Sequence, residues 1–135
     1  MSTWPTPTQI ETFLAGPADQ PVVMLNILSF KATADGMTDD SGAPLSGKDA
    51  VRQYSRAMKE FVERGGGTFV LAADIDSQVI GEGGEHFHFV GIMRYPSRQA
   101  YLALAGDPEV AGTIGRFREA GLASQWLFAM TEVAA

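Results

Sequence analysis

Four short runs of β-forming residues alternate with two helical segments along this chain, and their order restricts the folds that it can adopt. The runs are residues 21–31, 68–80, 86–95 and 122–131. Their density of Val, Ile, Leu and Phe is typical of strands. One helical segment lies between the first two runs and another between the last two. The order strand, helix, strand, strand, helix, strand predicts an α+β fold of the ferredoxin-like type with one antiparallel sheet.

Capping sequences mark the ends of the expected helices. Thr6-Pro7-Thr8-Gln9 combines an N-cap, a proline at the first helical position and a glutamine three residues after the cap. We expect a short helix from there to about Ala15. Ser46 and Asp49 have the spacing of a second cap, and the three glycines at 65–67 are expected to end the helix that follows.

The remaining segments are interpreted as connections. Residues 32–45 are rich in Gly, Asp, Ser and Thr and are expected to form a loop, and the glycines of 81–84 indicate a hairpin-type turn. Residues 97–120 are expected to be a helix that is broken or kinked at 106–108. We therefore divide the chain into an N-terminal helical extension, residues 1–20, and one ferredoxin-like domain, residues 21–135.

The expected strands are apolar on both faces, which is unusual for a sheet covered by helices on one side only. In the last strand, Trp126 and Phe128 point to one face of the sheet and Leu127 points to the other, so both faces are apolar. The first and third strands show the same pattern. An uncovered apolar face promotes aggregation, so a second copy of the chain is the expected cover, as in a dimeric α/β barrel. The alternative is that the N-terminal helix and the segment 32–45 cover part of this face.

Length, charge and cysteine content exclude several classes of function. The chain has 135 residues, which suits one domain, and it has no cysteine for a disulfide or a thiolate site. A net charge of −6 argues against binding to nucleic acid. The apolar runs are too short to span a membrane, and the N-terminus lacks the pattern of a secretory signal, so we expect a cytoplasmic protein.

Several polar residues stand where a core is expected. Asn26 interrupts an apolar strand and should have a hydrogen-bond partner, either structural or a ligand. Tyr54 lies on the apolar stripe of its helix, where it is either a core tyrosine or a site residue. Arg116 and Arg118 are two residues apart in a helix, so one of them is expected to point toward the sheet, where it would need an anion. Arg98 is expected to lie on a helix surface.

The segment His86-Phe87-His88 is the most suggestive of chemistry, since no established catalytic or nucleotide-binding motif is present. In a strand, His86 and His88 would share a face and could ligate a metal together with Glu82 or Glu85. The favoured alternative is one histidine in water and one in a hydrogen-bonded site, with no metal. By the same strand parity, His88 shares a face with Arg94, which stands at the strand end and could instead reach solvent.

Together, several segments resemble the family known as domain of unknown function 1330, a group of dimeric α/β-barrel proteins. The segments are Val22 to Phe30, Tyr54, the glycines before Thr68, Val90 to Arg98 with its Tyr95-Pro96-Ser97-Arg98 sequence, and Arg118 to Leu122. The resemblance covers about residues 21–131. It implies the ferredoxin-like fold, a homodimer, and a pocket between the sheet and the helices, but it supplies no substrate.

Carried over position by position, the resemblance associates Asn26, Tyr54, Arg94, Ser97 and Arg118 with that pocket. Members often have a Trp-Asp pair where this chain has Phe87-His88, so an acidic group is replaced by a base, and any role of that carboxylate is in doubt here. The loop at 32–45 is longer than expected and could cover the mouth of the pocket.

Three functions follow from these observations. The first is an enzyme without a cofactor, similar to the monooxygenases and isomerases that share the barrel, acting on a small organic molecule that is either neutral or anionic. In it His88 would be the acid or base, Arg118 or Arg94 would hold the anion, and Asn26 and Tyr54 would orient it. Ser97 is assigned to substrate binding. The second is a small-molecule-binding module without chemistry, and the third is a dimeric structural protein.

Overall fold

One four-stranded antiparallel sheet forms the centre of the computed structural model, which describes residues 4–134 apart from the side chain of Thr113. The strand order is β4-β5-β1-β6. The bounds are Val22–Phe30 for β1, Thr68–Asp74 for β4, Phe89–Tyr95 for β5 and Leu122–Met130 for β6. This order, with antiparallel neighbours throughout, is the predicted ferredoxin-like arrangement.

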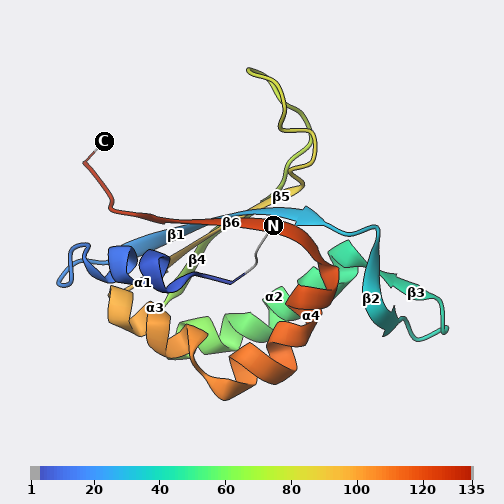
Figure 1. Ribbon diagram of the computed structural model, residues 1–135, viewed down its shortest axis with the longest axis horizontal. Coiled ribbons are helices and arrows are strands. Elements are labelled where there is room, and N and C mark those ends of the chain that lie inside the picture. Colours follow the sequence, from blue (N-terminus) through green and yellow to red (C-terminus); the bar gives the residue numbers. More distant parts are fainter. Residues whose placement is uncertain (1–3, 135) are drawn as a thin grey trace.

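The helices cover one face of the sheet (Figure 1). They are α1 (Pro7–Leu14), α2 (Gly47–Arg64), α3 (Arg98–Ala105) and α4 (Gly115–Gly121), and a π-helical turn at Val110–Ile114 precedes α4. The predicted caps are confirmed: Thr6 and Gln9 form a capping box, and Ser46 accepts a hydrogen bond from the backbone of Asp49. The main core lies between sheet and helices and includes Val22, Met24, Met58, Val62, Tyr95, Val110 and Ile114.

Two glycines end α2 for different reasons. Gly66 has φ +83°, a left-handed conformation that other residues adopt only with strain. At Gly67, a Cβ atom would lie 2.7 Å from a side-chain carbon of Val62. The chain can therefore turn tightly from the helix into β4.

Residues 32–45 are not simply a loop, so that prediction is wrong. They contain β2 (Thr33–Thr38), which pairs with β3 (Pro44–Ser46) in a separate two-stranded sheet. Two apolar residues explain it, because Ala34 and Leu45 are buried against Ala50 and Ala120. The segment was predicted as a loop because its few apolar residues are isolated in a polar sequence, yet they form a small core.

The predicted hairpin between the second and third main strands is also wrong in detail. β4 ends at Asp74 and β5 begins at Phe89, so His86 and His88 precede the strand. The segment Ile75–His88 is a long loop, in which Val79 and Ile80 are exposed. Strand-forming residues need a partner strand, and the glycine-rich sequence that follows provides none.

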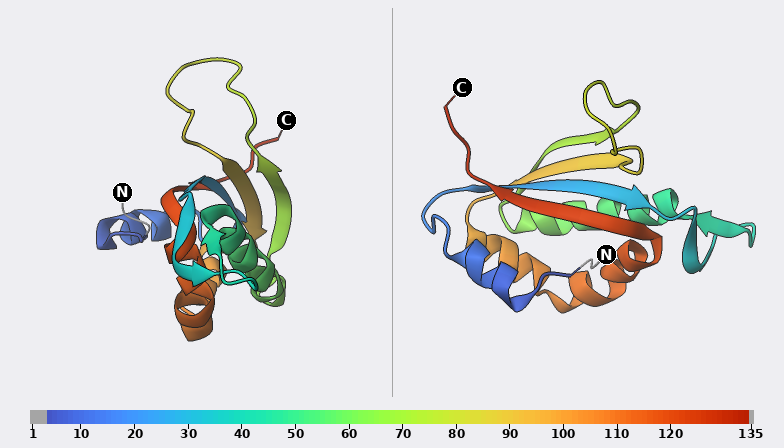
Figure 2. Two further views of the ribbon diagram at one scale, coloured as in Figure 1. Left: turned by 90° about the vertical axis from the view of Figure 1, so that its right-hand side faces the viewer. Right: turned by 45° about the horizontal axis from the view of Figure 1, so that its top comes forward.

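The face of the sheet opposite the helices is apolar and open. Cross-strand pairs share a face, and on this side Leu25 lies opposite Ile92 and Phe128, while Ile27 lies opposite Val90 and Trp126. We call this surface, with Leu71 of β4, the open face. Figures 1 and 2 show α1 beside α3 and the β2–β3 sheet near α4, both away from it. The alternative in which these segments cover the open face is therefore wrong.

No helix within residues 4–134 combines the length and the apolar character needed to cross a membrane.

Candidate functional site

A chain of polar side chains crosses the interior between the sheet and the helices. The guanidinium of Arg118, on α4, donates from Nε to Oε1 of Gln125, on β6, at 3.0 Å, and its terminal nitrogen donates to the same oxygen. The Nε2 atom of Gln125 donates to Oδ1 of Asn26, on β1, at 2.9 Å. Asn26 donates in turn to the carbonyl of Gly91, on β5, at 3.4 Å. Three main strands and one helix are thus connected by four residues.

Strand register explains why these residues meet. Gln125 pairs with Leu28, and Asn26 pairs with Leu127, so the two amides are diagonal neighbours on the helix side of the sheet. Arg118 is one turn from the end of α4, directly before β6 begins. The prediction that one of Arg116 and Arg118 points toward the sheet is confirmed for Arg118, and the partner expected for Asn26 is Gln125.

Two tyrosines lie near the same guanidinium. Burial raises the pKa of Tyr54, on α2, and the positive charge of Arg118 opposes this rise. Burial also raises the pKa of Tyr101, on α3. Tyr54 adds to this rise in pKa, and the positive charge of Arg118 opposes it. The effect of Arg118 on both pKa values indicates that both phenols lie within electrostatic range of the guanidinium. We call Asn26, Gln125, Arg118, Tyr54 and Tyr101 the interior polar cluster.

The segment before α1 covers one side of the interior polar cluster. The guanidinium carbon of Arg118 lies 4.9 Å from the centre of the Trp4 ring, and Trp4 Nε1 donates to Glu119 Oε1 at 2.8 Å. The indole thus rests on the charged side chain, in a cation–π contact. Trp4 is 47% exposed, so it forms the outer wall of the cluster.

Arg98 holds the end of α1, and the prediction that it lies on a helix surface is wrong. Its side chain is 8% exposed and donates to the carbonyl of Phe13 at 2.9 Å. The guanidinium also lies over the Phe13 ring, 4.9 Å from its centre. A cation at the carboxyl end of a helix is favourable, which explains its burial beneath α1.

His88 lies apart from the interior polar cluster, at the end of the sheet. Its Nδ1 accepts a 2.9 Å hydrogen bond from the backbone of Phe30, and its ring stacks on the Phe30 ring with centroids 5.6 Å apart. Neutral His88 therefore carries its proton on Nε2. The predicted strand face shared by His86, His88 and Arg94 is absent, because β5 begins at Phe89 and both histidines precede it.

The two other predicted residues have local roles. Arg94 forms an exposed ion pair with Glu132 on the open side of the sheet. Ser97 caps α3 by accepting a 3.0 Å hydrogen bond from the backbone of Ala100. Of the predicted site residues, the structure brings together Asn26, Tyr54 and Arg118 and leaves His88, Arg94 and Ser97 elsewhere.

The surface hollows lie outside the interior polar cluster. One hollow lies in the loop Ile75–His88, and another is lined by residues that include Phe30, Lys48 and His88. Within residues 4–134, no three His, Asp or Glu side chains gather closely enough to hold a metal ion.

Sequence reasoning missed Gln125, Tyr101 and Trp4. A signal existed for Gln125, because strand parity in 122–131 places it on the same face as Leu127, where a polar residue needs a partner. Tyr101 and Trp4 had no comparable signal, since their positions depend on how α3 and the N-terminal segment pack.

Comparison with solved structures agrees with this architecture. A crystal structure of the RPA0582 protein, described as a protein of unknown function from Rhodopseudomonas palustris, has a TM-score of 0.81 at 26% identity, covering 98% of this chain and 97% of that one. A DABB family protein with a ferredoxin-like fold, from Mesorhizobium loti, has a TM-score of 0.51 at 13% identity, covering 85% of this chain and 100% of that one. The chain has a ferredoxin-like fold.

A third similar structure is SnoaB, a cofactor-independent oxygenase from Streptomyces nogalater, with a TM-score of 0.50 at 13% identity, covering 84% of this chain and 96% of that one. This ferredoxin-like chain matches no family model and no curated protein.

Proposed function

We propose that the protein binds a small organic anion, such as a carboxylate or a phenolate, between its sheet and its helices. The observation that carries the proposal is the interior polar cluster. Asn26 and Gln125 orient one face of Arg118, and two phenols lie within range of its charge. A guanidinium matches the geometry of a carboxylate, and amides and hydroxyls add direction. Trp4 covers Arg118, so the proposal requires Trp4 to move before a ligand can reach the guanidinium from that side.

The second candidate function is a cofactor-independent reaction on the bound molecule, of the monooxygenase or isomerase type. Its support is the Tyr54 phenol, which is protonated at neutral pH and lies within electrostatic range of the Arg118 charge. A protonated phenol beside a guanidinium stabilises negative charge that develops on a substrate oxygen, as in an enolate. The similarity to SnoaB, a cofactor-independent oxygenase, adds an analogy of fold.

We also propose a homodimer in which the open faces of two copies pack together. The central positions of that face are apolar on three adjacent strands, and the N-terminal helix and the β2–β3 sheet lie on the other side. Packing of two such faces buries them as in a sandwich. Membership of the domain of unknown function 1330 family, and the division into an extension of 1–20 and a domain of 21–135, belong to the same proposal.

A ligand panel tests the binding proposal. Aromatic and aliphatic carboxylic acids and phenols would be compared with their amides and methyl ethers, which keep the shape and lose the charge. Displacement of Trp4 provides the signal, and a Trp126→Phe variant leaves Trp4 as the only tryptophan. The proposal predicts that the acids change the fluorescence and the neutral analogues bind at least tenfold more weakly. Equal binding of acids and neutral analogues would contradict it.

Oxygen uptake and product analysis separate the two candidates. With an acid that binds, an oxygenase consumes oxygen, an isomerase changes the ligand without oxygen, and a binding module returns the ligand unchanged. His88→Ala adds a further comparison, because His88 is separate from the interior polar cluster. Its loss should leave binding unchanged.

A further inference from the structure

The loop Ile75–His88 leaves the sheet on the open side and projects away from the helices (Figures 1 and 2). Val79 and Ile80 are 89% and 90% exposed. Large apolar side chains with so little cover from their own chain indicate a contact with another molecule. The loop therefore extends into the space that a partner on the open face would occupy.

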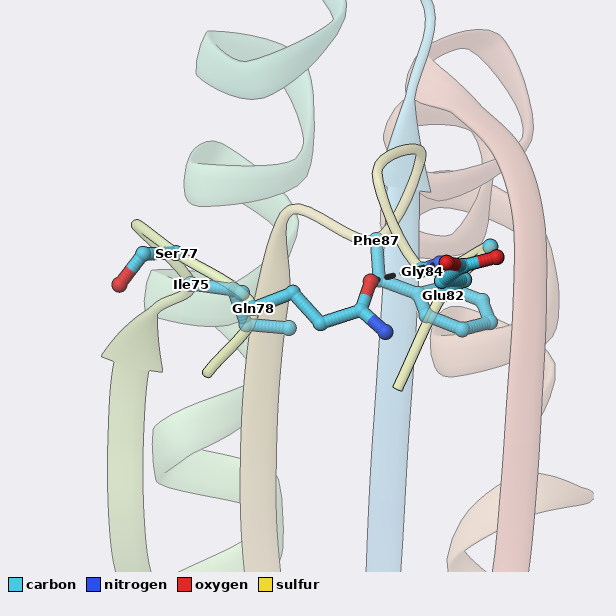
Figure 3. Close-up of a pocket in the computed structure, with 7 residues that line it drawn as sticks. Ile75, Ser77, Gln78, Glu82, Gly84 and Phe87 are labelled. Carbon is cyan, nitrogen blue, oxygen red and sulfur yellow. Dashed lines mark hydrogen bonds between the residues drawn. The ribbon is translucent and has the colours of Figure 1, made fainter. Parts of the chain in front are cut away.

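This loop is braced by internal hydrogen bonds. Gln78 Oε1 accepts from the backbone of Gly84 at 2.9 Å (Figure 3). Gln78 Nε2 donates to the carbonyl of Ile80 at 3.3 Å. The backbone of Phe87 donates to the carbonyl of Gly84 at 3.0 Å, and the Phe87 ring packs edge-on against Trp126 with centroids 5.6 Å apart. The loop thus stands on the open face at a defined position.

The projected area of the open face can be compared with the surface that a stable dimer buries. Four strands (β4, β5, β1 and β6) about 4.8 Å apart, two with 7 residues and two with 9, give a projected footprint of roughly 520 Å². A stable interface buries about 800 Å² on each partner. A projecting loop from each copy supplies additional contact area at the edges of the sheet.

We propose that the loop Ile75–His88 is an arm that grips a second copy of this chain, with Val79 and Ile80 packed against the side of the partner. The inference rests on the homodimer proposed above. The open face spans four strands, which is wider than a single bound peptide strand requires. The arm also carries Asp76, Glu82 and Glu85, which disfavours an anionic lipid surface.

Thiol labelling tests the contact directly, because the chain has no cysteine. In a Val79→Cys variant, the rate of alkylation should fall at least tenfold when the protein is concentrated from the monomer range into the dimer range. An Ala57→Cys variant, on the exposed side of α2, provides the control and should react at the same rate throughout. A Val79→Cys variant that reacts equally fast in monomer and dimer would overturn the proposal.

Sedimentation equilibrium separates the arm from the dimer itself. Val79→Asp combined with Ile80→Asp should weaken dimerisation at least tenfold without changing the circular dichroism spectrum, whereas Ala57→Asp should leave it unchanged. A dimer as tight as the wild type in the double variant would overturn the arm and leave the dimer intact. A monomeric wild-type protein would overturn both.

Discussion

Gln125 donates a 2.9 Å hydrogen bond to Asn26, although the two residues are 99 positions apart in the sequence. The bond connects β6 with β1 on the helix side of the sheet, in a layer that is otherwise apolar around Met24 and Leu28. Because the other atom of the same amide, Gln125 Oε1, accepts from Arg118 Nε, Gln125 fixes the direction in which the guanidinium points. Gln125 is therefore the residue that organises the interior polar cluster.

Replacement of Gln125 should destabilise the protein. A Gln125→Met variant keeps the volume but removes the partners of Asn26 Oδ1 and of Arg118 Nε, and an unsatisfied buried group costs about 1–3 kcal/mol. Urea unfolding measures the loss. Gln99→Met, at an exposed position of α3, is the control and should change stability by less than about 0.5 kcal/mol. If Gln125→Met had the same free energy of unfolding as the control, the hydrogen bonds of the Gln125 amide would not contribute to stability.

Stability should fall at alkaline pH because of Tyr54. Its pKa is raised in the folded state, so above its ordinary value near 10 the unfolded chain has released this proton while the folded chain still retains it. Deprotonation then favours unfolding, and the free energy of unfolding decreases as pH rises. The prediction is a smaller decrease in Tyr54→Phe than in the wild type between about pH 9 and pH 11, measured by urea unfolding. Parallel curves would mean that the Tyr54 pKa is not raised by folding.

Loss of Arg98 should release the N-terminal segment. An Arg98→Met variant removes the hydrogen bond to the Phe13 carbonyl and the cation over the Phe13 ring. Chymotrypsin should then cleave after Phe13 at least tenfold faster, while an Arg64→Met variant, with an exposed arginine on α2, should match the wild type. Unchanged cleavage would indicate that α1 is held by contacts other than Arg98.

The sequence predicted the strands of the sheet and the caps of the helices, because both depend on local patterns. Apolar runs of the right length fixed β1 and β6, and the capping box at Thr6 and Gln9 fixed the start of α1. Features that depend on contacts between distant segments of the chain were predicted less well. The strand beginning at Phe89 was placed three residues too early, since no local pattern shows where a ladder loses its partner.

The candidate site was only partly predictable for the same reason. Asn26 was found because it interrupts an apolar strand, and Tyr54 because it lies on the apolar stripe of its helix. Arg118 was found because it is two residues from Arg116 in a helix, so that one of the two was expected to point toward the sheet. His88 was misplaced along with the strand start, and Ser97 turned out to be a helix cap, a role that its position before α3 could have indicated. Arg98 was missed because its burial depends on α1, which is packed from outside the main fold.

The most direct measurement is the affinity of an acid ligand for two arginine variants that differ by two positions. Arg118→Gln removes the charge from the interior polar cluster, whereas Arg116→Gln removes the same charge from an exposed side chain over Phe117. With the tightest acid from the panel, calorimetry should show at least a tenfold loss of affinity in Arg118→Gln and less than a twofold change in Arg116→Gln. Equal affinities in both variants would contradict a binding site at Arg118.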